Sequence, residues 1–108
     1  MGRCARDDVV LEKMTPQVVL SGQLVCASDD EVATVLRHLP RHIDLTRAEQ
    51  GCISFEVHQT DDRYVWQVDE RFVDEAAFDA HQARVSASEW GRVTAGIERR
   101  YSIRGTAR

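Results

Sequence analysis

The stretch from Tyr64 to Arg84 constrains the fold most, because the spacing of its apolar residues changes once along it. Over residues 64–72 every second side chain is apolar or aromatic, apart from one carboxylate, as in a strand that covers a core. Asp74 then stands where a helix N-cap is expected, and the following apolar residues recur at helical spacing. A strand that leads directly into a helix directs several side chains toward one cavity. These side chains are Trp66, Glu70, Phe78 and His81.

The segment before this stretch predicts a strand, an interrupted helix and a second strand. Residues 17–27 are rich in β-branched residues, are apolar on both faces, and contain Gly22, which marks a bulge or the close approach of another group. Ser28 caps a helix, and Pro40 is expected to kink or break it before Gly51 ends a second helical segment. The apolar stripe of this helix is expected to comprise Val32, Val35, Leu36, Leu39 and Ile43.

Two more strands and a short helix complete the pattern. Cys52–His58 alternates with Ile53, Phe55 and Val57 predicted to face inward, and turn residues 59–63 join it to the next strand as a hairpin. Residues 86–89 match a capping box that opens a short helix, and residues 97–103 form a last strand.

The resulting order, β-α-β-β-α-β, is that of the ferredoxin-like split βαβ fold, an α+β class with an antiparallel four-stranded sheet. We expect residues 1–16 to form an N-terminal arm and residues 17–105 to form the single domain. Helices on one face leave the other sheet face uncovered, whereas the first strand is apolar on both sides. A homodimer through the sheet faces is therefore expected.

Composition limits the possible partners. The formal charge is −4, and the basic residues are scattered, so nucleic acid is not expected as a partner. No apolar run approaches the roughly 20 residues that span a bilayer, so we expect no membrane association and a cytoplasmic location. The three cysteines, Cys4, Cys26 and Cys52, lack CxxC spacing. Cys26 and Cys52 are interpreted as buried reduced thiols, whereas Cys4 in the arm is expected to be open to oxidation.

Histidines offer no clear metal site. His38 and His42 are four residues apart, as two metal ligands on a helix are, but Pro40 lies between them and no third ligand is evident. We therefore expect both to be solvated helix residues and no metal to be bound. His58 is expected at a strand end on the polar surface.

Several short motifs together resemble the antibiotic biosynthesis monooxygenase family. In this family an acidic residue, a Gly and a Cys lead into a strand. A Glu flanked by aromatic residues ends the next strand, and a His follows on a helix. The matching residues are Arg47-Ala48-Glu49-Gln50-Gly51-Cys52, Phe55-Glu56-Val57, Glu70-Arg71-Phe72, Ala77-Phe78 and His81. The resemblance implies a dimeric α+β barrel whose relatives include cofactor-independent oxygenases of anthrones and quinols, and also haem-degrading enzymes.

Under this resemblance His81 is the candidate base or anion-orienting group, since the pKa of a His lies close to working pH. The alternative is that His81 is a packing residue on the apolar side of its helix. Glu70 is either a second catalytic group or a structural support, because a buried carboxylate must be paired or protonated. As a support it is expected to bond to His81 or to an Arg such as Arg84, Arg99 or Arg71 of the partner subunit. Each of the aromatic candidates is either a wall of the substrate site or part of the core. They are Trp66, Phe72, Phe78, Tyr64 and Tyr101.

The functional hypothesis is a monooxygenase that oxidises a quinol, anthrone or related aromatic substrate with O2 and needs no cofactor. The alternative is a non-catalytic protein that binds a small aromatic ligand or assists a pathway. The resemblance implies that haem-degrading relatives combine an Asn on the first strand with a Trp and a His. This chain contains no asparagine, which makes haem degradation a minor alternative.

Overall fold

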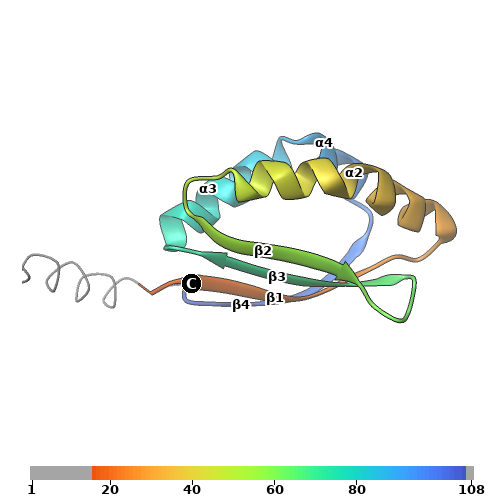
Figure 1. Ribbon diagram of the computed structural model, residues 1–108, viewed down its shortest axis with the longest axis horizontal. Helices are drawn as coiled ribbons and strands as arrows, with labels where there is room; N and C mark the ends of the chain where they lie inside the picture. The colour runs from red at the N-terminus through yellow and green to blue at the C-terminus, as the bar shows by residue number, and fades with distance from the viewer. Residues whose placement is uncertain (1–15, 107–108) are drawn as a thin grey trace, which may run out of the picture.

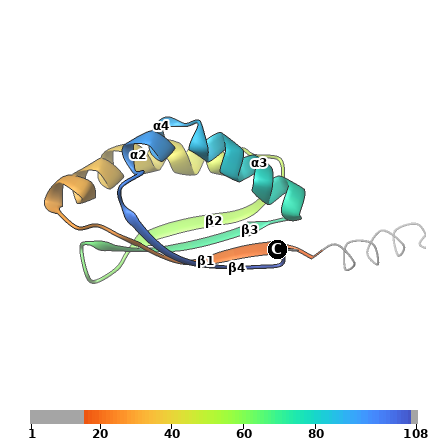
Figure 2. The ribbon, with the colours of Figure 1, turned by 180° about the vertical axis from the view of Figure 1, so that it is seen from behind.

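The computed structural model describes residues 16–106, which form one four-stranded antiparallel sheet with three helices on one of its faces (Figures 1 and 2). In chain order the elements are β1 (Val18–Val25), α2 (Asp29–Arg47), β2 (Cys52–Gln59), β3 (Val65–Phe72), α3 (Glu75–Ser86), α4 (Glu89–Val93) and β4 (Glu98–Arg104). The predicted α+β class and the order of its elements are confirmed. Most of the predicted arm, including Cys4, lies outside the described residues.

The strands run in the order β2-β3-β1-β4 across the sheet, so the first strand occupies a central position. β2 and β3 form the predicted hairpin, and β1 pairs with both β3 and β4. Gly22 of β1 lies opposite Tyr101, and a Cβ atom at Gly22 would lie 2.1 Å from the carbonyl oxygen of Arg100. The expected close approach at this glycine is therefore made by the backbone of β4.

α2 passes through Pro40 without a break, which corrects the predicted division into two helical segments, while a kink at Pro40 stays a prediction. A proline removes one backbone N–H and leaves a carbonyl one turn earlier without its helical partner. Pro40 and Leu36 both lie on the exposed side of α2, where water can satisfy that carbonyl. Leu36 is 55% exposed and does not belong to the buried stripe, which instead continues from Leu39 to His42 and Thr46.

The start of β2 also departs from the predicted alternation. The pairing of β2 with β3 shifts between Cys52 and Ser54, which marks a β-bulge or a similar irregularity. Ile53 is consequently 45% exposed rather than inward, whereas Phe55 beyond the shift is buried as predicted.

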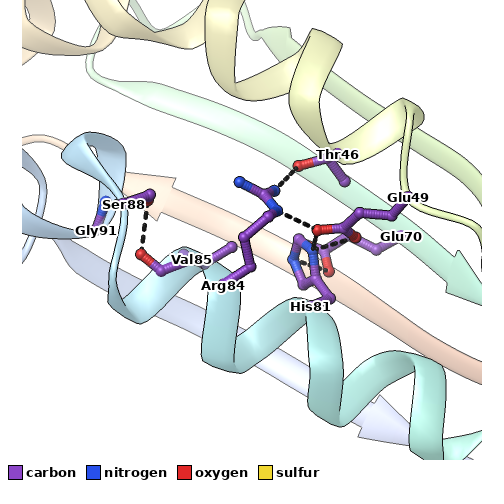
Figure 3. A network of polar contacts seen from close by, with 8 residues as sticks. All are labelled: Thr46, Glu49, Glu70, His81, Arg84, Val85, Ser88 and Gly91. Carbon is purple, nitrogen blue, oxygen red and sulfur yellow. Dashed lines mark hydrogen bonds and ion pairs between the residues drawn. The ribbon is translucent and has the colours of Figure 1, made fainter.

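The helix ends follow from local hydrogen bonds. The side chain of Asp74 accepts from the backbone N–H of Ala77 at the start of α3, so the predicted N-cap is confirmed. α4 is capped by Ser88, which accepts from the N–H of Gly91 and donates to the carbonyl of Val85 (Figure 3), two residues later than the predicted Ser86.

Gly51 does not end α2, whose C-cap is Ala48. A Cβ atom at Gly51 would lie 2.3 Å from the Cβ atom of Ala77, so the glycine allows α3 to pack closely on the loop before β2. The loop and α3 thereby come close enough for Glu49 and His81 to interact.

The sheet face opposite the helices is more polar than was expected from a first strand that is apolar on both sides. Its central strands carry Val19 and Val25 at the ends of β1, but Ser21 between them hydrogen bonds to Asp69 of β3 at 2.7 Å.

Among residues 16–106 no helix combines the length and apolar character needed to cross a membrane.

Candidate functional site

A cavity of about 330 Å³ lies between the sheet and the helices. Its walls come from all four strands and from α2, α3 and α4, and they are mainly apolar; they include Leu24, Phe55, Val68 and Trp90. Its polar or charged lining residues include His42, Glu70, His81, Arg99 and Tyr101.

Glu70 of β3 and His81 of α3 meet at this cavity (Figure 3). Oε1 of Glu70 lies 3.6 Å from Nε2 of His81, and the two side chains are 8% and 3% exposed. The same Oε1 atom is buried and has no hydrogen-bond partner within the described residues. The expectation that Glu70 bonds to His81 or an Arg is met only by this long contact with His81.

The other nitrogen of His81 faces a second carboxylate. Nδ1 lies 2.9 Å and 3.2 Å from the two oxygens of Glu49, which follows α2. Arg84, one turn after His81 on α3, pairs through Nε with Glu49 and donates through its terminal nitrogen to Oγ1 of Thr46 at 2.9 Å. Figure 3 shows that Glu49 thus joins the imidazole to the guanidinium.

The pKa values of Glu70 and His81 are shifted in opposite directions, upward for Glu70 and downward for His81. Burial, with a smaller contribution from the nearby Glu49, raises the pKa of Glu70 to about 7, although Arg99 opposes the rise. Burial lowers the pKa of His81, while Glu49 acts in the opposite direction. Near neutral pH both the protonated and the ionised forms of Glu70 are therefore populated, and burial favours the neutral form of His81.

His42 is buried, which corrects the expectation that it is solvated. Its ring stacks on the indole of Trp90 with 4.6 Å between centroids and 6° between planes. Burial, followed by the charges of His81 and two arginines, lowers the pKa of His42 to about 3, so its imidazole remains neutral. Its Nδ1 atom has no hydrogen-bond partner within the described residues. His38 and His58 are less buried and lie beside Glu89 and Glu56, respectively.

Arg99 and Tyr101 line the cavity from β4. The guanidinium of Arg99 donates to the carbonyl oxygens of Thr94 and Ile97, which fixes its position. Burial raises the pKa of Tyr101 to about 12, so its hydroxyl keeps its proton and can donate it in a hydrogen bond.

Of the seven site residues predicted from the sequence, the structure places Glu70, His81 and Tyr101 at the cavity. Trp66, Phe72 and Phe78 are buried core residues that do not line it. Phe72 packs against His81 with ring centroids 4.8 Å apart, and Phe78 packs against Phe72. Phe72 therefore supports His81 directly, and Phe78 supports Phe72, although neither ring lines the cavity.

Tyr64 lies away from the cavity, at the end of the hairpin. Its hydroxyl donates to Asp29 at 2.7 Å, at the beginning of α2. An alternating strand pattern shows which side chains share a face, but it does not show which of them lie under a helix and which lie beside a gap.

Sequence reasoning did not select Glu49 as a site residue. It considered Arg84 and Arg99 only as possible partners of Glu70, and His42 only as a possible metal ligand. Glu49 belongs to the acidic segment before Gly51, which was noted only as part of a motif. His42 continues the helical spacing of Val35 and Leu39, and this spacing indicates burial once the helix is continuous through Pro40. Residues 16–106 contain no cluster of His, Cys, Asp or Glu side chains suited to hold a metal ion.

The sheet, the helices on one side of it and the cavity between them define a ferredoxin-like α+β domain. Solved structures share this fold. A protein from Mycobacterium tuberculosis, Rv0793, superposes with a TM-score of 0.65 at 19% identity, over 85% of this chain and 96% of the other. MupZ from Pseudomonas fluorescens gives a TM-score of 0.71 at 13% identity, over 86% of this chain and 70% of the other.

A Deinococcus radiodurans protein described as a putative antibiotic biosynthesis monooxygenase gives a TM-score of 0.65 at 16% identity, over 84% of this chain and 93% of the other. At these identities the likeness establishes the fold alone. The sequence model of the antibiotic biosynthesis monooxygenase family matches residues 25–92. The chain belongs to this family. A comparison with curated proteins gives no match.

Proposed function

We propose that this protein is a monooxygenase that oxidises a small aromatic substrate of the anthrone or quinol class with O2 and without a bound cofactor. The observation that carries the proposal is Glu70, a buried carboxyl that lines an apolar cavity, contacts His81 and has a pKa raised to about 7. A general base is most effective when its pKa lies near the working pH. Family membership supports the reaction class.

The proposed oxidation requires a base and an enclosed site. For an anthrone, the Glu70 carboxylate takes a proton from the CH2 group, and the resulting anion gives one electron to O2. The substrate radical and superoxide combine to form a C–O bond, which after protonation gives a hydroperoxide. Loss of water then breaks the O–O bond and leaves a C=O group. One oxygen atom enters the product and the other leaves as water, and the substrate supplies all four electrons.

Two groups on β4 suit the anionic intermediate. Arg99 places a positive charge at the cavity, and Tyr101 keeps its hydroxyl protonated, so both favour a negative oxygen on the substrate.

The apolar walls proposed to contact the substrate rings are Leu24, Phe55 and Val68. They take the place of four aromatic residues expected from the sequence, Trp66, Phe72, Phe78 and Tyr64. The volume of about 330 Å³ lies at the low end of the range of roughly 300–1,000 Å³ for small-molecule sites.

We also propose that two copies assemble through the uncovered sheet faces. Val19, Val25 and Val65 provide apolar contact there, and Asp69 and Arg71 provide opposite charges that a second copy can pair.

Cys26 and Cys52 are free thiols, which suits the reducing cytoplasm that we propose as the location.

Haem does not fit the site. A His that would bind haem iron needs a free ring nitrogen, but Nδ1 of His81 is bonded to Glu49 and Nε2 faces Glu70. Trp66, the second residue of the haem-degrading pattern, does not line the cavity. We therefore derive no reaction through haem.

One observation favours a non-catalytic binding protein as the second candidate. His81 is 3% exposed and both of its nitrogens are engaged by carboxylates, so it can act as a packing residue of a ligand site. In that case the cavity holds a small aromatic molecule without turnover.

Oxygen uptake by the purified, metal-stripped protein with a panel of anthrones and quinols separates the two candidates. The monooxygenase predicts uptake above the uncatalysed rate and at least a tenfold loss in Glu70→Gln and in His81→Ala, equivalent to about 1.4 kcal/mol. Glu56→Gln, at an exposed carboxylate paired with Arg47, is the matched control and should keep the wild-type rate. Uptake equal to the blank, together with a compound that raises the melting temperature, favours the binding protein.

A further inference from the structure

One buried imidazole, His81, stands between two carboxylates that come from different parts of the fold. Glu49 approaches Nδ1 from the segment after α2, and Glu70 approaches Nε2 from β3 (Figure 3). A neutral imidazole carries one N–H donor and one acceptor nitrogen. The two contacts therefore cannot be of the same kind when His81 is neutral.

The two carboxylates have different surroundings. Glu49 forms an ion pair with Arg84, whose guanidinium is also bonded to the fully buried Thr46, so the Glu49 carboxylate is fixed as an acceptor. Among residues 16–106 Glu70 has no Arg or Lys within ion-pair distance, and its Oε1 atom has no hydrogen-bond partner. Glu70 is thus the carboxyl better suited to carry a proton.

From this geometry we infer that Glu49 is a positioning residue: it holds the proton of His81 on Nδ1 and so keeps Nε2 as an acceptor that faces Glu70. The pair Glu70–His81 then passes its proton between Oε1 and Nε2. Glu49 does not itself touch the cavity, since it is absent from the lining residues. Its effect on the reaction is exerted through His81 and rests on the proposed function.

The opposite tautomer would weaken the base. With the proton on Nε2, His81 would donate to Oε1 of Glu70 and stabilise the ionised carboxylate, which lowers the pKa of Glu70. A carboxylate with a lower pKa is a poorer base at neutral pH. The position of one proton on His81 therefore sets the strength of the group that removes a proton from the substrate.

Other charged groups near the pair bear on any pH dependence. His81 faces Glu49, Glu70 and Arg84, and the ring of His42 on α2 lies 6.3 Å from its own. Glu70 is also influenced by Arg99 on β4. Cys52 lies near both Glu49 and Glu70, and burial raises the pKa of its thiol, so it stays protonated.

Glu49→Gln tests the inference sharply because Arg84 fixes the orientation of the new amide. The Nε–H group of Arg84 must meet an acceptor, so the amide oxygen takes the place of Oε2 and the NH2 group faces Nδ1 of His81. An NH2 donor requires an acceptor at Nδ1, and the proton of His81 then moves to Nε2. Glu56→Gln provides the matched control, since Glu56 forms an exposed ion pair with Arg47.

The readout is the ¹⁵N spectrum of histidine-labelled protein between pH 6 and 8, with His81 assigned by the loss of its signals in His81→Gln. Wild type should show a protonated Nδ1 and an unprotonated Nε2, Glu56→Gln should be the same, and Glu49→Gln should show the reverse. A wild-type Nε2–H tautomer overturns the inference without any variant. An unchanged tautomer in folded Glu49→Gln overturns it as well.

Activity adds a second readout. Glu49→Gln should lower the oxygen uptake rate at pH 7.5 at least tenfold and should move the acidic limb of its pH profile to lower pH, because Glu70 loses both the nearby negative charge and its acceptor partner. A reversed tautomer with an unchanged pH profile overturns the link to the base. A reversed tautomer in a protein that consumes no oxygen with any substrate shows instead that the proposed function fails while the positioning role of Glu49 holds.

Discussion

Oε1 of Glu70 lies 3.6 Å from Nε2 of His81, and both side chains are almost completely buried. Burial opposes the charged form of each group, so it raises the pKa of Glu70 to about 7 and lowers the pKa of His81. At neutral pH Glu70 is therefore present in both its protonated and its ionised form, beside an imidazole for which burial favours the neutral form. This relationship determines both the stability of the protein as a function of pH and the chemistry proposed for the cavity.

Glu70 should make the protein less stable as the pH rises. The folded pKa of about 7 exceeds the reference value of 4.5, so between these values the folded state binds more protons than the unfolded state. The stabilising contribution of neutral Glu70 is fully present below pH 4.5 and is lost as the pH rises through 7, a change of about 3 kcal/mol. Glu70→Gln stays neutral and should lack this loss.

Urea denaturation of wild type and Glu70→Gln at pH 4.5, 6 and 8 measures the difference. The free energy of unfolding of the variant should increase relative to that of wild type across this range. A difference that stays constant with pH contradicts the raised pKa.

His42 should have the opposite effect. Its folded pKa of about 3 lies below the reference value of 6.5, so its contribution is present above pH 6.5 and is lost as the pH falls toward 3. His42→Phe keeps a ring against Trp90 and removes the unpartnered Nδ1 atom. At pH 4.5 the variant should be about 3 kcal/mol more stable relative to wild type than it is at pH 7.5. Acid denaturation followed by circular dichroism measures this, and coincident acid transitions would speak against it.

Gly22 should not tolerate a side chain. In Gly22→Ala the new Cβ atom would meet the carbonyl oxygen of Arg100, so β1 and β4 must separate locally, at a cost of about 1–3 kcal/mol. Gly96→Ala is the matched control, because nothing lies within 4 Å of its Cβ position. Thermal unfolding of both variants checks the prediction, which fails if their melting temperatures are equal.

The proposed dimer can be tested independently of any substrate. Sedimentation equilibrium at micromolar concentration should give twice the chain mass of 12.3 kDa. Val65→Lys places a charge on the uncovered sheet face beside Val25 and should weaken association at least tenfold. A wild-type protein that sediments as a monomer contradicts the proposal.

The order of the strands and helices was predictable because alternation, helical spacing and caps act locally. The hairpin between β2 and β3 and the cap at Asp74 are examples. Pro40 was misjudged because the local cost of a proline is offset where its helix packs on a core and its carbonyl partner faces solvent. Ile53 was misplaced because the register shift before Ser54 reverses the faces of a strand.

The site was predictable only in part. Glu70 was identified because a carboxylate in an aromatic row is unusual, and His81 was identified because it matches the family motif and the ordinary pKa of a His lies close to working pH. Glu49 was missed because its role arises from contacts with residues 32 and 35 positions later, which no local pattern reveals. Trp66 and Phe78 were assigned to the cavity because spacing defines a face of an element and not the gap between layers.

The dependence of oxygen uptake on pH, for a substrate from the panel whose own pKa lies well above 9, tests the role of Glu70 most directly. The wild-type rate should rise with pH through about 7 and then level off, because the ionised carboxylate is the base. Glu70→Gln should lose at least 90% of the rate at pH 8, and its residual rate should lack this rise. A variant that retains the wild-type rate and the same inflection contradicts the assignment of Glu70 as the base.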